Sequence, residues 1–183
     1  MIKRLILLFF LLATGSGAHL YNDSMLLIYS KIVPRMMMLD NTERVQKKRR
    51  SLCILYEKVD RPVAGKLKKL VKENLPPQVR GDFEVVTESY DRKWSERCRN
   101  STAFMLLDTK RDNIAEVLKL ANEKRLLTFS YSNSLLKQGV AVSLMTGKKI
   151  YPIINLKAVK SSSLKFDPMI YQTSKIYDGG SIR

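Results

Sequence analysis

The chain has 183 residues, a hydrophobic content of 45% and a formal net charge of +16 at pH 7. The length suits one domain with its own core, and the hydrophobic content argues against a disordered chain. The positive charge fits an acidic partner, anionic lipid headgroups or an ordinary lysine-rich surface, and no nucleic-acid-binding motif accompanies it.

The N-terminus has the order of a secretory signal. Two basic residues precede an apolar stretch from Leu5 to Ala13, and small residues follow at Ser16 and Ala18. The stretch is shorter than the about 20 residues that a spanning helix needs, although an uncleaved anchor or a buried helix is an alternative. We predict a signal peptide at residues 1–18, cleaved after Ala18, and an exported single domain over residues 19–183.

Residues 20–50 are predicted to form a helix and a connector. Helix-capping side chains at residues 22–24 precede an apolar run that reaches Val33. Pro34 is expected to end or kink this helix. The polar, charged stretch over residues 40–50 then leads into the core as a solvated connector.

The core, residues 51–178, begins with alternating strands and helices. Asp60 and Asp112 open two helical patterns, and each pattern lies between short apolar runs. Strands that are separated by helices of this length pair in parallel. The predicted strands are Ser51–Tyr56, Phe83–Thr87, Ser101–Leu107 and Leu126–Tyr131.

The end of the predicted sheet differs from its beginning. The runs Val140–Met145 and Ile150–Ile154 flank a four-residue link that contains Gly147, which indicates an antiparallel hairpin. The expected fold is therefore α/β: a three-layer, Rossmann-like domain with a mainly parallel sheet and a C-terminal antiparallel hairpin.

Three further features follow the hairpin. Asn155 is expected to cap a short helix. Asp167 begins a last helix that carries Ile170 and Ile176 on its apolar side. The tail at residues 179–181 contains two glycines and is expected to fray.

The two cysteines, Cys53 and Cys98, are predicted to form a disulfide. An even number of cysteines in an exported chain favours a bridge, and two separate buried thiols are the alternative. Neither cysteine has a C-x-x-C partner that would mark a reactive thiol, so the bridge is expected to support stability rather than chemistry.

The sequence offers little catalytic chemistry. Its one histidine is His19, so the chain lacks the histidines that most catalytic triads and most zinc sites require. No dinucleotide-binding or P-loop pattern occurs. We expect no enzyme activity, no metal and no cofactor.

The predicted sheet could instead hold a ligand pocket at the ends of its strands. Glu57 follows the first predicted strand and Asp108 the third, and open α/β sheets bind ligands at the carboxyl ends of their strands. These side chains are equally compatible with loops that bind nothing. The candidate pocket residues are Tyr56, Glu57, Lys58, Asp108, Thr109 and Lys110.

The C-terminal stretch resembles a known family. Leu126–Ser130 (LLTFS) is followed by Gly139, the predicted hairpin, the segment Ile154–Ala158 (INLKA) and a last amphipathic helix. This order resembles the YfiR-like family of bacterial periplasmic proteins, and the similarity extends over about residues 20–177. The resemblance marks residues 19–183 as one YfiR-like domain in the periplasm.

The resemblance implies a non-enzymatic regulator. Its type member binds the periplasmic sensor domain of a membrane-anchored diguanylate cyclase and represses it, and relatives tend to form homodimers whose cysteines respond to redox state. We therefore expect a membrane sensor as the partner, a role in cyclic-di-GMP signalling, and no nucleic-acid partner. A solute-binding module that serves a transporter or receptor, with a small ligand, is the alternative.

Overall fold

The computed structural model describes residues 21–42, 49–91 and 93–183. The predicted signal peptide at residues 1–18, and His19, lie outside these ranges.

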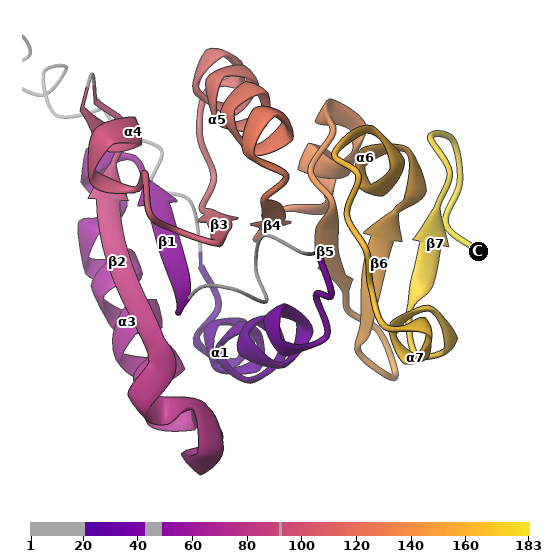
Figure 1. The fold of residues 1–183 in the computed structure, drawn as a ribbon, viewed down its shortest axis with the longest axis horizontal. Coiled ribbons are helices and arrows are strands. Elements are labelled where there is room, and N and C mark those ends of the chain that lie inside the picture. Colours follow the sequence, from indigo (N-terminus) through magenta and orange to yellow (C-terminus); the bar gives the residue numbers. More distant parts are fainter. Residues whose placement is uncertain (1–20, 43–48, 92) are drawn as a thin grey trace, which may run out of the picture.

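One seven-stranded sheet runs through the molecule, with the strand order β2-β1-β3-β4-β5-β6-β7 (Figure 1). The strands from β2 across to β5 pair in parallel, β5 and β6 pair antiparallel, and β7 returns parallel to β6. The predicted α/β class, with a mainly parallel sheet and a C-terminal antiparallel pair, is confirmed. The strands are β1 (Arg50–Tyr56), β2 (Phe83–Ser89), β3 (Ala103–Leu106), β4 (Leu127–Ser130), β5 (Val142–Met145), β6 (Tyr151–Asn155) and β7 (Lys175–Tyr177).

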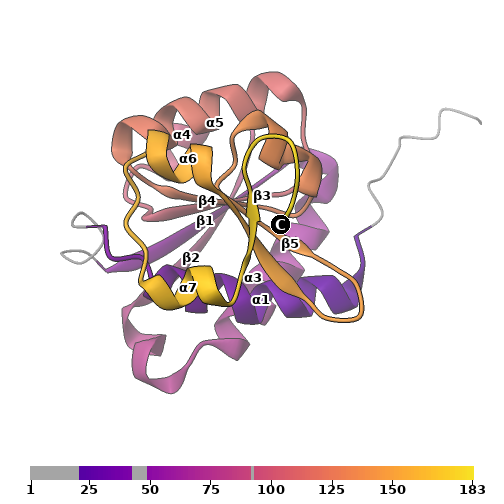
Figure 2. The same ribbon diagram turned by 90° about the vertical axis from the view of Figure 1, so that its right-hand side faces the viewer.

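Helices cover both faces of this sheet and give the predicted three layers. Figure 2 shows α1, α3 and α7 below the sheet and α4, α5 and α6 above it. The helices are α1 (Asp23–Met38), α3 (Arg61–Asn74), α4 (Trp94–Arg97), α5 (Arg111–Lys124), α6 (Leu156–Ser161) and α7 (Pro168–Gln172), with short 3-10 helices η2 (Lys58–Asp60), η3 (Pro77–Asp82) and η4 (Asn133–Gln138).

Strand β1 shows how the sequence divides the core between the two faces. Successive side chains of a strand point to opposite faces of the sheet. Leu52 and Ile54 lie in the larger apolar cluster with α1 and α3, whereas Cys53 and Leu55 lie in the smaller cluster with α4 and α5. All four side chains are fully buried, so the middle of β1 is covered on both faces of the sheet.

Helix α1 begins as predicted and ends later. The Asn22 side-chain oxygen accepts hydrogen bonds from the backbone N–H groups of Ser24 (2.8 Å) and Met25 (3.3 Å), which caps the helix. Pro34 lies inside the helix and does not end it. The helix continues to Met38 because burial of its apolar face, Pro34 included, offsets the hydrogen bond that proline removes.

The C-terminal prediction was partly wrong. The last helix stops at Gln172, and Ile176 lies instead in β7, where it pairs in register with Ile154 of β6. The tail does not fray, because Ile176 and Arg183 exchange two backbone hydrogen bonds of 2.9 and 3.0 Å. Gly179 adopts a left-handed backbone, with φ of 105°, which lets the chain turn back along β7.

Candidate functional site

The parallel strands deliver polar and aromatic residues to one edge of the sheet. Glu57 follows β1, Tyr90 follows β2, Asp108 comes shortly after β3, and Tyr131 follows β4. Because these strands run in parallel, their carboxyl ends meet at the same edge. We call these four residues, together with Tyr21 and Asp60, the strand-end cluster.

Tyr21 links the N-terminal segment to this cluster. Its hydroxyl donates to Asp60 Oδ2 at 3.1 Å and accepts from the Asp108 backbone N–H at 3.0 Å. Burial raises the pKa of Tyr21 well above its usual value, and the nearby Asp60 carboxylate raises this pKa further. The phenol therefore stays protonated and remains a donor at neutral pH.

Asp60 has a different role from the one its position suggests. It stands at the N-cap position of α3, yet its side chain makes no capping hydrogen bond. Its buried carboxylate accepts from Tyr21 instead. The predicted helix start is correct, but the Asp60 side chain does not cap the helix, because a phenol from the N-terminal segment engages it.

Two further tyrosines fix α1 against the end of β4. The Tyr131 ring lies 4.8 Å from the Tyr21 ring and 5.4 Å from the Tyr29 ring, measured between centroids. The Tyr29 hydroxyl lies 2.9 Å from the carbonyl oxygen of Ser130 and 3.0 Å from that of Tyr131. Burial raises the pKa of Tyr29 to about 12, so it too remains a donor.

The structure brings together only part of the predicted pocket. Glu57 accepts hydrogen bonds from the Thr109 hydroxyl and, at 2.9 Å, from the Asn113 side-chain amide. Asp108 contributes its backbone N–H to Tyr21. The remaining predicted residues divide between the core and the surface: Tyr56 is buried in the cluster with α1 and α3, and Lys58 and Lys110 are exposed.

Tyr90 is a site residue that sequence reasoning missed. Its hydroxyl is buried and has no hydrogen-bond partner among the described residues. Burial, reinforced by the negative charges of Glu57 and Asp108, raises its pKa well above the usual value. Such a group can bond to a ligand at little cost, because it has no partner among the described residues to give up. Its only signal in the sequence was its place directly after the second strand.

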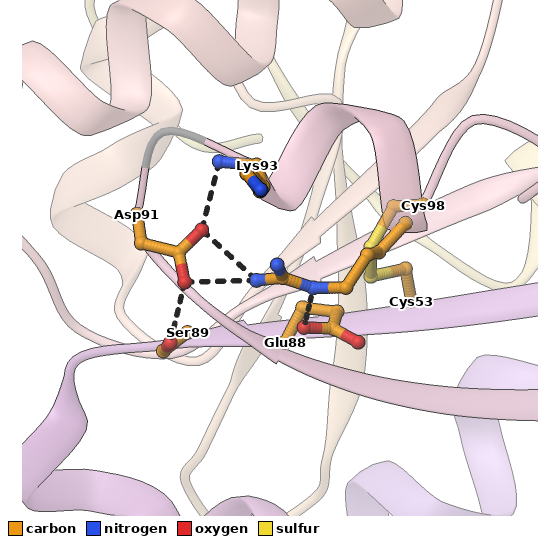
Figure 3. A network of polar contacts seen from close by, with 7 residues as sticks. Cys53, Glu88, Ser89, Asp91, Lys93 and Cys98 are labelled. Atoms are coloured by element: carbon orange, nitrogen blue, oxygen red, sulfur yellow. Dashed lines mark hydrogen bonds and ion pairs between the residues drawn. A yellow bond between two sulfur atoms is a disulfide. The ribbon is translucent and has the colours of Figure 1, made fainter.

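Cys53 and Cys98 are joined by a disulfide, with their Cα atoms 5.9 Å apart (Figure 3). Cys53 lies in the middle of β1, and Cys98 ends α4. The bridge therefore attaches the connection between β2 and β3 to the strand that it crosses.

An ionic network holds the same connection. Arg97 of α4 donates to the Glu88 carboxylate and, at 2.9 Å, to both oxygens of Asp91. Asp91 also accepts from the Lys93 backbone N–H at 2.8 Å (Figure 3). That N–H above all, and then Arg97, hold the pKa of Asp91 below its usual range.

Trp94 packs the connection between β2 and β3 against the apolar core. Its side chain is buried, and its ring meets the Phe104 ring of β3 edge to face at 5.8 Å between centroids. The tryptophan therefore belongs to the core.

The INLKA segment has a structural explanation in Asn155. Its side-chain oxygen accepts from the Ala158 backbone N–H at 3.2 Å and so caps α6, as predicted. Its amide nitrogen donates to the carbonyl oxygens of Leu136 (2.8 Å) and Val140 (3.1 Å). One buried side chain thus ties the start of α6 to the turn before β5.

The described residues hold neither a metal-binding cluster nor a membrane-spanning helix. No group of three or more His, Cys, Asp or Glu side chains among these residues could hold a metal ion. None of the helices over the same residues is long and apolar enough to cross a membrane.

Solved structures share the fold at very low sequence identity. The chain is similar to the ABC domain in complex with L-Trp from Streptococcus pneumonia, at 6% identity and a TM-score of 0.57, over 80% of this chain and 59% of that one. It is also similar to a conserved domain protein from Vibrio cholerae, at 11% identity and a TM-score of 0.55, over 82% of this chain and 59% of that one. This chain thus spans about three fifths of each neighbour, and the likeness shows the α/β fold alone. No curated protein matches the sequence.

A protein-family model matches most of this chain. The model of YfiR/HmsC-like proteins matches residues 40–175, which extend from the connector before β1 to the first residue of β7. The match includes both cysteines, most of the strand-end cluster and the INLKA segment. The chain therefore belongs to the YfiR/HmsC-like family.

Proposed function

We propose that this protein is a periplasmic, non-enzymatic regulator that binds the sensor domain of a membrane-anchored diguanylate cyclase, or a similar membrane sensor, and represses it. The observation that carries the proposal is the family match over residues 40–175. The predicted signal peptide at residues 1–18 supports export.

The site geometry fits recognition better than catalysis. Glu57 is bonded to Thr109 and Asn113, and Tyr21 is bonded to Asp60 and Asp108. The Tyr21 contacts join the N-terminal segment to the sheet, and the Glu57 contacts join the end of β1 to the start of α5. A net charge of +14, after removal of the two basic residues of the signal, would speed encounter with an acidic sensor surface at low salt.

The test is deletion in the native host with measurement of cyclic-di-GMP. Loss of a repressor should raise the cyclic-di-GMP level, and a restored copy should return it to the parental value. A copy that lacks residues 1–18 is the matched control and should fail to restore it, because it stays on the wrong side of the membrane.

A membrane pull-down provides the second measurement. The tagged exported chain should recover a sensor with a cytoplasmic output domain from solubilised membranes. An unchanged cyclic-di-GMP level, together with no recovered sensor, would contradict the proposal.

A solute-binding module is the second candidate, and Tyr90 is the observation that favours it. Its buried hydroxyl lacks a partner among the described residues and lies near Glu57 and Asp108. Native mass spectrometry of protein purified from its host should then show a bound small molecule. Tyr90→Phe should lower the bound fraction while leaving the unfolding midpoint unchanged or higher.

A further inference from the structure

A groove lies on the side of the sheet that carries α5 and α6. Two neighbouring cavities of about 290 and 260 Å³ share the lining residues Leu118, Lys137 and Gln138. The first extends to Lys157 and Ala158 of the INLKA segment, and the second extends along the first turns of α5. We call the two together the α5–α6 groove.

The charge of the groove has one sign. Among the described residues, its lining includes three exposed basic residues, Arg111, Lys137 and Lys157, and no acidic residue. The nearby carboxylate of Asp178 is already paired with Arg183 at 3.0 Å. An occupant that complements this groove must therefore carry negative charge.

Two leucines give the groove an apolar part, and hydrogen bonds hold the adjoining turn in place. Leu118 and the buried Leu136 form part of it. Gly139 lies beside them with φ of 111°, and a Cβ atom there would lie 3.4 Å from Leu118 Cδ1. The two hydrogen bonds from the Asn155 amide fix the turn that carries Leu136 and Gly139. A groove that is already shaped loses little entropy on binding.

We propose that the α5–α6 groove binds an extended acidic segment of the partner protein. This inference rests on the proposed function, in which a membrane sensor is the partner. Arg111 lines one cavity, Lys157 lines the other and Lys137 lines both, so an occupant that reaches all three cations must extend across the two cavities. Apolar side chains of the segment would contact Leu118 and Leu136, and its carboxylates would contact the basic rim.

The first test uses a defined probe, a fluorescent eight-residue peptide that alternates Glu with Leu. The groove variant is Lys137→Glu with Lys157→Glu. The matched control is Lys31→Glu with Lys72→Glu, which makes the same charge change at exposed positions on α1 and α3. Circular dichroism and the urea midpoint should show that both variants fold.

We expect the groove variant to bind the peptide at least tenfold more weakly than the parent, and the control to stay within twofold. Backbone NMR shifts should map to the amides of Leu118, Gly139 and Ala158. Equal loss in both variants, shifts elsewhere, or no binding to the parent would overturn the inference. Citrate that displaces the peptide at equal concentration would assign the groove to a small anion instead.

A membrane pull-down separates this inference from the proposed function. If the parent and the control recover a sensor and the groove variant does not, the groove is the docking surface. If the groove variant recovers as much sensor as the parent, the groove inference fails and the proposed function stands. If the parent recovers none, the proposed function fails, and the peptide experiment alone decides whether the groove binds acidic segments.

Discussion

Helices α4 and α5 both connect parallel strands and pack on the same face of the sheet, yet different forces hold them. Helix α5 has 14 residues, and its buried stripe of Ile114, Val117 and Ala121 packs on that face. Helix α4 has four residues, of which only Trp94 is buried. A helix this short is not stable by itself.

The path of each connection explains the difference. The chain from β2 to β3 passes over β1, which lies between them in the sheet. This places Cys98 above Cys53. The disulfide and the Arg97 ion pairs hold the connection on the sheet, which the short helix α4 could not do by itself. Apolar packing is enough for a long crossover, whereas a short one needs covalent and ionic contacts.

The largest expected effect comes from removing the disulfide. Cys53→Ala with Cys98→Ala should lower the free energy of unfolding by about 4 kcal/mol, because the bridge closes a loop of 45 residues in the unfolded chain. Urea unfolding measures this loss, and hydrogen exchange should quicken most at Trp94–Arg97 and less in α5. An equal urea midpoint for the parent with and without reductant would contradict the expectation.

The next effect tests the apolar support of α5. Val117→Ala should lower the free energy of unfolding by about 2 kcal/mol, since this fully buried side chain leaves a cavity. Urea unfolding of the oxidised protein measures this loss, and an unchanged midpoint would contradict the expectation. Lys119→Ala, at an exposed position of the same helix, is the control and should leave the midpoint almost unchanged.

A smaller effect is expected from the ionic network. Arg97→Gln removes the ion pairs to Glu88 and Asp91 and should lower the urea midpoint less than Val117→Ala does. Salt should shrink the difference from the parent, since exposed ion pairs are screened. Arg99→Gln is the nearby exposed control. A loss that exceeds that of Val117→Ala would show that ionic contacts contribute more than apolar packing.

The smallest effect is a dependence on pH. The folded-state pKa of Asp91 lies below its unfolded value, so its contribution to stability is present above the unfolded pKa and is lost as the pH falls through the folded pKa. Urea midpoints of the parent and of Asp91→Asn should therefore converge in acid. Lys93→Ala keeps the backbone N–H that contributes most and should retain the parental pH dependence.

The sequence was sufficient to place the main strands along the chain and to predict their parallel pairing, because apolar runs alternate with helices of crossover length. It did not determine the strand order in the sheet, β2-β1-β3-β4-β5-β6-β7. It did not reveal α4, since four residues carry no periodic pattern. It also placed Ile176 in a helix, because one apolar residue near a chain end does not distinguish a helix from a strand. Pairing with β6 decides the matter, and that contact is distant in sequence.

The candidate site was less accessible to sequence reasoning. Glu57 and Asp108 could be predicted because they directly follow strands. Tyr21 and Asp60 could not, since their contact joins residues 39 positions apart. Tyr90 carried no signal beyond its place after a strand, because a missing hydrogen-bond partner exists only in three dimensions.

The two outer edges of the sheet differ in whether they can pair with a further strand. The C-terminal tail covers β7, whereas no strand in the described part of the chain pairs with the outer edge of β2. A sheet with one covered edge can accept a guest strand on one side only. Edge-to-edge pairing through β2 would therefore join two copies and leave the covered β7 edges on the outside, which makes such growth self-limiting.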